Sequence, residues 1–379
     1  MGISYRQHND KKWEYRIKLK DPITKRYKEK SKRGFNTKPE ARFAAQKVEK
    51  RMLEGHNYED VSLKYYLDFW LEEYKKDNVR KNTYLTLKNS VDNHIKPYFE
   101  DINVKELTPG LYQKFLNHAH EKGLAYNTIK KIHNALNSAM NRAAIDKKIE
   151  SNPCSNPVFK GQEKKQDIKF IDSAEVGNFL TNAYQYGYIY WVFFKLLTET
   201  GLRKGEAAAL QWTDINFKEL TIDINKSLDF QPNDPSELFG ETKNYNSERV
   251  ITMSKMLAKD LRFHMTYQNQ NKLALKEIYH HDLNLVLCRN DGNFMPKSSL
   301  FNAFERILKR SDIKPLPIHS LRHTHAVLLL EAGASMKYIQ KRLGHGSMQI
   351  TSDVYSHVSK KIEKDNTDQF EDYMAKILE

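Results

Sequence analysis

The hydrophobic periodicity of this chain changes along its length, and that change limits the folds that it can adopt. Residues 12–34 alternate polar and apolar side chains in short stretches, a period of two that predicts β-strands. From residue 41 onward apolar residues recur every three or four positions, which predicts amphipathic helices. The 379 residues also exceed one ordinary domain of ~100 to 200 residues, so we expect several domains.

Breaks in this pattern divide the chain into three segments. Thr37 has the character of a helix N-cap, and the helical pattern over residues 41–52 ends near Gly55. Helical periodicity returns from residue 61 to about 149, and residues 151–167 have the proline, glycine and charged composition of an exposed linker. We predict three domains, a small β-sheet with one helix, a helical bundle and a larger C-terminal domain, over residues 1–56, 61–152 and 168–379.

The third segment combines long helices with a small amount of sheet. A continuous helix is expected over residues 173–197, and strands over residues 220–225 and 249–253, with helix over most of the rest. In the bundle we expect an aromatic face to form core, made of Leu63, Tyr66, Phe69, Trp70 and Tyr74. The predicted fold class is therefore multidomain α+β.

The positive charge of the chain is concentrated at one end. Residues 1–56 hold 17 Lys and Arg against seven Asp and Glu, which is +10 of the total net charge of +14. Such a load favours a polyanion partner, because cations near phosphates release condensed counterions. Nucleic acid fits better than an anionic membrane, since the most apolar run, residues 188–197, is about half a membrane span and contains Lys195.

Cysteine content and the first residues bear on the compartment. Cys154 and Cys288 are too few for a disulfide framework or a Cys-rich zinc site, and the N-terminal sequence has no apolar signal region. We therefore expect a reducing, cytoplasmic environment.

Five side chains with related chemistry follow one another in the C-terminal half. They are Arg203, His319, Arg322, His345 and Tyr355. A phenol can attack a phosphodiester while guanidinium groups hold the phosphate oxygens and favour the phenolate, so this ordered set predicts phosphodiester chemistry.

The expected helix ends give these residues a common setting. Gly201 fits a left-handed C-cap before Arg203, and a new helix is expected from about Gly205. Ser320 is the expected N-cap of a helix that runs through Leu330. Arg322 would then lie at the positive end of that helix dipole, which is unfavourable unless an anion binds.

Two further observations complete the site and leave one alternative open. Ser335 can cap a helix that Gly344 ends, immediately before His345. The alternative is a metal cluster of His319, His323 and His325, although neither a Cys nor a dedicated carboxylate completes that set.

The ordered set resembles the tyrosine recombinase, or phage integrase, family of DNA strand-exchange enzymes. The resemblance matches its first arginine to Arg203, its His-x-x-Arg pair to His319 and Arg322, its second histidine to His345 and its nucleophile to Tyr355. It also matches the family's hairpin lysine to Lys243 and an acidic position to Glu206. Asn244 replaces the threonine common after that lysine, and Lys226 is a rival for its role.

The resemblance implies a mechanism without metal or other cofactor. Tyr355 would form a 3′-phosphotyrosyl intermediate and release a 5′-hydroxyl, and a second 5′-hydroxyl would reverse the step on a new partner strand. His319 would assist proton transfer, His345 would hydrogen-bond the phosphate and Lys243 would protonate the leaving oxygen.

The resemblance also implies partners. Residues 1–56 would bind arm-type sites on double-stranded DNA, while the bundle and catalytic domain would bind core-type attachment sites as a homotetramer. An excisionase or a DNA-bending host factor, and a cytoplasmic location associated with the nucleoid, are expected as well. The amphipathic pattern of residues 362–378 fits packing either on a neighbouring subunit or on its own domain.

Two other functions remain open at this point. One is a DNA-binding architectural or regulatory protein that does not use the catalytic set. The other is a relaxing topoisomerase of the type IB kind with the same tyrosine chemistry.

Overall fold

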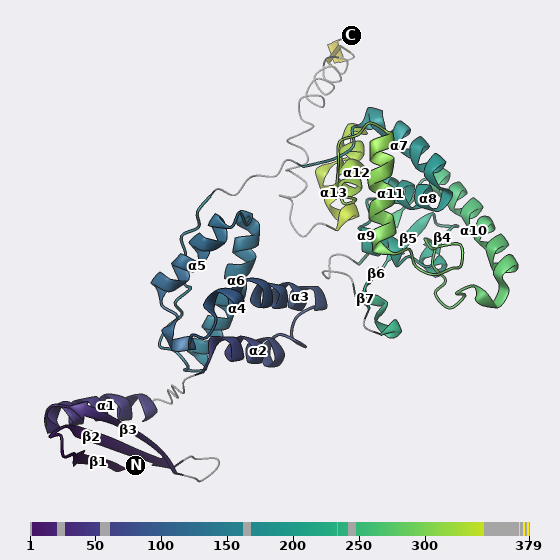
Figure 1. Ribbon diagram of the computed structural model, residues 1–379. Helices are drawn as coiled ribbons and strands as arrows, with labels where there is room; N and C mark the ends of the chain where they lie inside the picture. The colour runs from purple at the N-terminus through teal and green to yellow at the C-terminus, as the bar shows by residue number, and fades with distance from the viewer. Residues whose placement is uncertain are drawn as a thin grey trace. The chain divides into compact units, whose positions relative to one another are not determined.

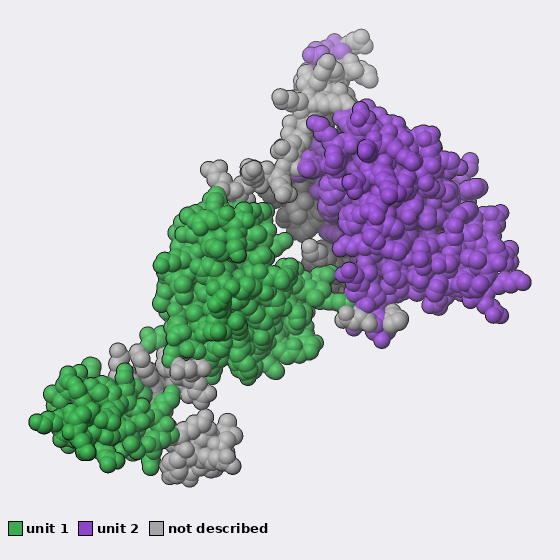
Figure 2. All heavy atoms as spheres, in the orientation of Figure 1, with its two compact units in different colours: residues 1–165 green, residues 166–379 purple. Residues whose placement is uncertain are grey.

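The computed structural model describes most of the chain and divides it into two compact units. The described residues are 2–20, 27–53, 61–161, 168–232, 234–241 and 248–344, with single positions near the C-terminus at 371, 374, 375, 377 and 378. Unit 1 is Met1–Lys165 and unit 2 is Gln166–Glu379, and Figure 2 colours them separately. Lys243, His345 and Tyr355 lie outside the described residues, as does most of the predicted amphipathic tail.

The N-terminal part of unit 1 is an antiparallel sheet with one helix. Its strands, in the order β1-β2-β3, are β1 (Gly2–Gln7), β2 (Trp13–Lys20) and β3 (Tyr27–Phe35). Helix α1 (Lys38–Leu53) packs on the sheet through Ala45, against Tyr15 and Ile17 of β2 (Figure 1). The Thr37 hydroxyl accepts from the Glu40 backbone N–H, so Thr37 caps this helix as predicted.

Strand β1 was not expected from the sequence. It pairs along its whole length with β2, with Ile3 opposite Ile17 and Tyr5 opposite Tyr15. Ile3 and Tyr5 thereby join the same small core. The sheet thus gains a third strand, in which the alternation of polar and apolar side chains is too short to predict a strand from the sequence.

The rest of unit 1 is a helical bundle with an apolar core. Its helical elements are α2 (Leu63–Tyr74), α3 (Lys81–Ser90), a π-helical turn (Val91–Ile95), α4 (Lys96–Phe99), a 3₁₀ turn (Val104–Glu106), α5 (Pro109–Glu121) and α6 (Tyr126–Ile145). The Thr108 hydroxyl accepts from the Leu111 backbone N–H and caps the start of α5.

One residue of the predicted aromatic face of α2 lies elsewhere. Phe69 is 40 % exposed, whereas Leu67 is fully buried. Burial in α2 follows Leu63, Tyr66, Leu67, Trp70 and Leu71. These positions are spaced three and four apart, so the buried stripe follows the helix period and Phe69 lies beside it.

Unit 2 is mainly helical, with two small antiparallel sheets. Its helices are α7 (Ser173–Tyr186), α8 (Tyr188–Thr200), α9 (Lys204–Ala208), α10 (Lys255–Leu275), α11 (Lys297–Arg310), α12 (Ser320–Glu331) and α13 (Met336–Leu343). The strands are β4 (Ile215–Asn216), β5 (Thr221–Ile224) and β8 (Arg249–Thr252), in the order β4-β5-β8, and a hairpin of β6 (Lys226–Leu228) and β7 (Phe239–Glu241).

Helix α8 lies at the centre of the core of unit 2. Phe194 of α8 packs against Phe179 of α7 and Phe304 of α11, with ring centroids 6.1 and 5.2 Å from its own. The single helix predicted over residues 173–197 is therefore wrong: the chain leaves helical geometry at Gly187, where φ is 168°, and α8 starts anew. The break lets α7 fold back on α8 (Figure 1).

The architecture as a whole confirms the predicted α+β class, with a small sheet and one helix, a helical bundle and a mainly helical unit. Among the described residues, no helix combines the length and apolar character needed to cross a bilayer.

Candidate active site

Two left-handed glycine turns bring the ends of α8 and α13 together. Gly201 ends α8 with φ of 66° and Gly344 ends α13 with φ of 65°, as the sequence predicted. A Cβ on Gly201 would lie 2.5 Å from Leu343 Cδ2 and 2.7 Å from His325 Cδ2. The turn that carries Arg203 therefore packs directly on α12 and α13.

Arg203 stands at the start of α9 and is held by the acidic residue of its own motif. Its Nη1 donates to Glu206 Oε1 at 2.5 Å, and its backbone N–H donates to Glu206 Oε2 at 3.0 Å. Its Nη2 donates to the Gly344 carbonyl at 3.4 Å. Glu206 thus orients both the helix start and the guanidinium that precedes it.

Arg322 is buried in the first turn of α12. Its Nη1 donates to the Gly201 carbonyl at 2.8 Å, its Nη2 donates to the Leu343 carbonyl, and only 2 % of the residue is exposed. Burial first, and then the charge of Arg203, lower the pKa of Arg322 to about 9, so it stays cationic at neutral pH. A buried cation held by neutral carbonyls is a site that an anion would stabilise.

Arg249 completes the cluster and was missed as a site residue. It begins β8, its side chain is 7 % exposed, and its Nη2 donates to Glu206 Oε2 at 3.0 Å. Its Nε donates to the Arg342 carbonyl at 2.7 Å. A signal was present in the sequence: Arg249 shares the inward face of its strand with buried Ile251, and a charged residue on such a face needs a buried partner.

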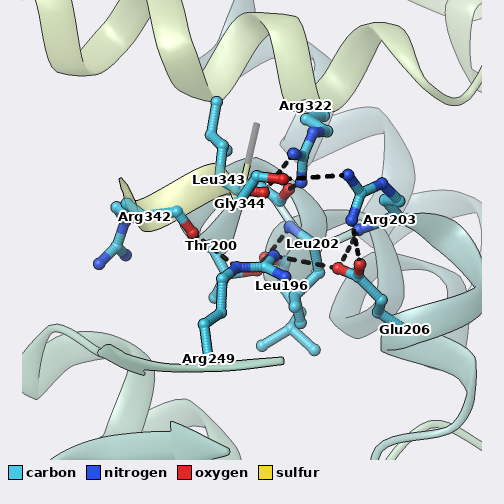
Figure 3. A network of polar contacts seen from close by, with 11 residues as sticks. Leu196, Thr200, Leu202, Arg203, Glu206, Arg249, Arg322, Arg342, Leu343 and Gly344 are labelled. Carbon is cyan, nitrogen blue, oxygen red and sulfur yellow. Dashed lines mark hydrogen bonds and ion pairs between the residues drawn. The ribbon is translucent and has the colours of Figure 1, made fainter. Parts of the chain in front are cut away.

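Arg203 and Arg249 thus pair with one carboxylate, that of Glu206, while Arg322 lies in the same network on the carbonyls of Gly201 and Leu343 (Figure 3). Burial alone would raise the pKa of Glu206, but the charges and hydrogen bonds of Arg249 and Arg203 outweigh it and hold that pKa below its usual value. Glu206 is therefore ionised at neutral pH. Together with Arg322 the cluster carries two positive charges in excess, which suits binding of a phosphate.

The same arginines receive the end of α13. Arg249, Arg322 and Arg203 donate in turn to the carbonyls of Arg342, Leu343 and Gly344. These carbonyls lie at the negative end of the helix dipole, where the last carbonyls of a helix lack partners within the helix itself. The cluster therefore fixes the last described turn before residue 345 (Figure 3).

His319 lies beside this cluster and is the residue that immediately precedes α12. Desolvation by the surrounding groups first, then His323, Arg322 and Arg203, lower the pKa of His319 to about 4, although the residue as a whole is exposed to solvent. Its ring centroid is 5.0 Å from that of His323. A neutral imidazole next to guanidinium groups can accept or pass on a proton.

The expected capping role of Ser320 is wrong. The structure makes Ser320 the first residue of α12, with His319 in the N-cap position. The Ser320 hydroxyl is buried and has no hydrogen-bond partner among the described residues. The helix starts one residue early because the turn before it is already closed by the hydrogen bond from Ser320 N–H to the Pro317 carbonyl.

The metal alternative finds no support in this geometry. His325 Nδ1 contacts the Thr198 carbonyl at 2.9 Å, and its Nε2 accepts from Arg342 Nε at 3.0 Å, so both ring nitrogens are engaged. Across the described ranges, no group of three or more His, Cys, Asp or Glu side chains could hold a metal ion.

The rival lysine is also engaged. Lys226 Nζ lies 2.7 Å from both carboxylate oxygens of Asp214 and 2.8 Å from Asn225 Oδ1. A lysine in a two-oxygen ion pair is poorly placed to give its proton to another group.

Three protein-family models match successive parts of the chain. The model of the phage integrase family matches residues 169–361, more than half of the sequence. The phage integrase N-terminal SAM-like domain matches residues 62–120, and the arm DNA-binding domain matches residues 3–52.

Curated relatives include an integrase and a protein named as a tyrosine recombinase. The chain is 29 % identical over 297 residues to the ICEBs1 integrase of Bacillus subtilis, covering 78 % of this chain and 79 % of the relative. It is 26 % identical over 320 residues to the XerC-like tyrosine recombinase of Caldanaerobacter subterraneus, covering 80 % and 81 %.

Solved structures share the fold. The integrase of the Tn1549 transposon, in complex with a circular intermediate DNA, aligns with a TM-score of 0.65 at 18 % identity, over 82 % of this chain and 99 % of that one. A lambda integrase dimer bound to a core site aligns with a TM-score of 0.59 at 17 % identity, over 92 % and 93 %. With the family match, these results favour the recombinase interpretation over its two alternatives, and the chain belongs to the phage integrase family of tyrosine recombinases, the DNA strand-exchange enzymes.

Proposed function

We propose that this chain integrates mobile-element DNA, with Tyr355 as the nucleophile and Arg203 and Arg322 as the phosphate clamp. The observation that carries the proposal is the excess of positive charge around one carboxylate, with Arg322 buried against neutral carbonyls. A phosphodiester bound there would supply the missing negative charge. The same field would favour phenolate over phenol during attack.

The reaction conserves the phosphodiester bond energy. The Tyr355 oxygen attacks phosphorus, its proton passes to a base, and the 3′-phosphotyrosyl bond forms as the bond to the 5′-oxygen breaks. Neutral His319 assists the proton transfer, His345 hydrogen-bonds the phosphate, and Lys243 protonates the leaving 5′-oxygen. The engagement of Lys226 with Asp214 favours Lys243 for this last role.

The domain and partner assignments are part of the same proposal. Residues 1–56 bind arm-type DNA, residues 61–152 bind core-type DNA and residues 168–379 catalyse strand exchange. The matches to the arm DNA-binding and SAM-like models support this division. A lambda integrase tetramer solved on a Holliday junction, to which this fold is similar, supports a homotetramer on double-stranded DNA.

Regulation and location follow from the proposed reaction. An excisionase or a DNA-bending host factor would set the direction of exchange. The protein would act in the cytoplasm, on the chromosome and associated with the nucleoid. A pull-down from cells that carry the element, with and without DNase, tests both statements.

The nucleophile is tested by covalent trapping on a nicked attachment site, whose sequence comes from the DNA that flanks the gene. Wild type is expected to form a covalent complex, and Tyr355→Phe is expected to bind the same DNA without trapping it. Tyr184→Phe is the matched control, because Tyr184 is 59 % exposed on α7. Absence of trapping by wild type, or trapping by Tyr355→Phe, would contradict the proposal.

The arm-binding role is tested by deleting residues 1–56. Because this segment carries +10 of the net charge, binding to DNA with arm sites is expected to weaken and its salt dependence to become less steep. Trapping on a core site alone is expected to persist. Unchanged arm-site binding would remove this part of the proposal.

A further inference from the structure

The side chain of Arg342 joins three separate elements near the end of α13. Its Nη1 donates to the Thr252 carbonyl at 3.0 Å, at the end of β8, and its Nη2 donates to the Glu199 carbonyl at 3.3 Å, in the last turn of α8. Its Nε donates to His325 Nε2 of α12 at 3.0 Å. Figure 3 shows this side chain directed away from the arginine cluster that receives the backbone of its own helix.

His325 is built to accept this hydrogen bond. Its Nδ1 lies 2.9 Å from the Thr198 carbonyl, which can only accept, so Nδ1 carries the proton and Nε2 is left as an acceptor. The ring is buried, and burial followed by the charge of Arg342 lowers its pKa to about 3. His325 therefore stays neutral and in one tautomer over the physiological range.

The last turn of α13 is consequently held from two sides. The backbone carbonyls of Arg342, Leu343 and Gly344 accept from the arginine cluster, while the Arg342 side chain is fixed to α8, β8 and α12. All three main acceptors of that side chain are neutral groups from different segments. These hydrogen bonds therefore fix the position of the Arg342 side chain without pairing its charge with an anionic group.

We propose that Arg342 is a positioning residue of strand transfer, which sets the place and direction in which the chain leaves α13 toward His345 and Tyr355. This inference rests on the proposed function, since it needs Tyr355 as the nucleophile. Attack requires the reacting atoms about 3 to 3.5 Å apart, and a misplacement of about 1 Å costs on the order of a hundredfold in rate. A helix end that can shift would therefore slow chemistry without weakening the DNA contacts of other elements.

Lysine is the informative replacement for Arg342. Lysine keeps the charge near the helix C-terminus, but its single Nζ cannot reach three acceptors that the guanidinium meets from three nitrogens. If only charge matters, Arg342→Lys will behave as wild type. If position matters, Arg342→Lys will resemble Arg342→Gln.

The experiment measures trapping on the nicked attachment-site DNA with the full chain. At saturating DNA, the single-turnover trapping rate of Arg342→Lys and Arg342→Gln is expected to fall about 10- to 100-fold. Their Kd for the same DNA is expected to change by less than about threefold, because the DNA contacts that set Kd are made by other residues. Lys341→Gln, an exposed neighbour in the same turn, is the control for lost charge and is expected to trap at the wild-type rate.

Variants of His325 keep the inference testable if an Arg342 variant does not fold. His325→Gln retains one acceptor and one donor and is expected to keep most of the trapping rate, whereas His325→Leu removes both and is expected to match Arg342→Gln. Hydrogen exchange of residues 336–344 is expected to speed up in the slow variants only.

The outcomes separate this inference from the proposed function. If wild type and Lys341→Gln do not trap DNA, the proposed function fails. If they trap and Arg342→Lys traps equally fast, or if Arg342→Gln changes Kd alone, the positioning role of Arg342 is wrong while the proposed function stands. Equal rates for His325→Gln and His325→Leu would also overturn it.

Discussion

The helical bundle of residues 61–161 and the part of unit 2 over residues 168–344, which we propose is the catalytic unit, bury different kinds of side chain. In the bundle, Ser90 is the one polar residue in the buried set, and the rest is apolar. The catalytic unit buries an arginine, a glutamate and two histidines, which are Arg322, Glu206, His264 and His325. Burial of charge opposes folding, so the catalytic unit gives up stability at the place where a phosphate is expected to bind.

The largest expected effect is the loss of the central carboxylate. Glu206→Gln leaves the buried guanidinium groups without their counter-charge and is expected to destabilise the protein by about 3 to 5 kcal/mol. Chemical denaturation followed by fluorescence measures this loss. Added sulfate is expected to raise the Tm of the variant more than that of wild type, because the uncompensated cluster binds anions more strongly.

The bundle supplies the control for that variant. Glu121 and Lys160 lie 3.5 Å apart with side chains 65 % and 49 % exposed, and Glu121→Gln is expected to change stability by less than about 0.5 kcal/mol. Equal stability of the two variants would contradict the contrast between the regions.

A core truncation in the bundle has a different signature. Leu136 is fully buried in α6, and Leu136→Ala is expected to cost about 2 to 5 kcal/mol through lost burial and a cavity. Below the melting transition, trapping at saturating DNA is expected to remain at the wild-type rate. Leu85→Ala, at a position 46 % exposed, is the control and should be nearly neutral; a trapping defect in Leu136→Ala would show that the bundle core also shapes the catalytic site.

Acid should weaken the catalytic unit through its buried histidines. Burial lowers the pKa of His264 to about 4 and that of His325 to about 3, so their contribution to stability is complete above about pH 6.5 and is lost as pH falls toward those values. When the pH falls from 7 to 5, each of these two histidines is expected to lower the free energy of unfolding by about 1 to 2 kcal/mol.

Calorimetry of the full chain at several pH values measures this acid sensitivity. Replacing His264 by Gln is expected to flatten the dependence of Tm on pH between 7 and 5. Glu206 does not contribute in that window, because its pKa lies below its usual value. An unchanged pH dependence in His264→Gln would exclude His264 as a source.

The smallest expected effect is that of Gly333→Ala, and its comparison with Gly201→Ala separates backbone strain from packing. Gly201 and Gly333 both have positive φ, 66° and 76°, but a Cβ on Gly333 meets nothing within 4 Å. Gly333→Ala is expected to cost about 1 kcal/mol, and Gly201→Ala about 1 to 3 kcal/mol with slower trapping, because its methyl group would press on His325 and Leu343. Equal costs for the two variants would show that α12 and α13 yield easily at this contact.

Local signals predicted much of the architecture. The helix ends at Gly201 and Gly344 and the caps at Thr37 and Ser335 were correct, because each depends on a few neighbouring residues. The extra strand β1 and the break between α7 and α8 were missed. Both depend on pairing or packing with other elements, which outweighs a weak local pattern.

The residues of the candidate site also divide into those that the sequence predicted and one that it did not. Arg203, His319 and Arg322 were identified from their order and residue type, and the structure brings Arg203 and Arg322 to the two carbonyls at the end of α13. Arg249 was missed because its contacts span 43 and 93 residues along the chain. Lys243, His345 and Tyr355 remain predictions.

The sequence by itself determined the kind of chemistry, since an ordered set of arginines, histidines and a tyrosine suits few reactions other than phosphoryl transfer. It also determined where the helices around that set end. Only the tertiary structure decided how the charges balance, with one glutamate shared by two arginines and a third arginine buried on carbonyls. The physical reason is that a side chain's cost of burial depends on its neighbours in space, and those neighbours come from segments far apart in the chain.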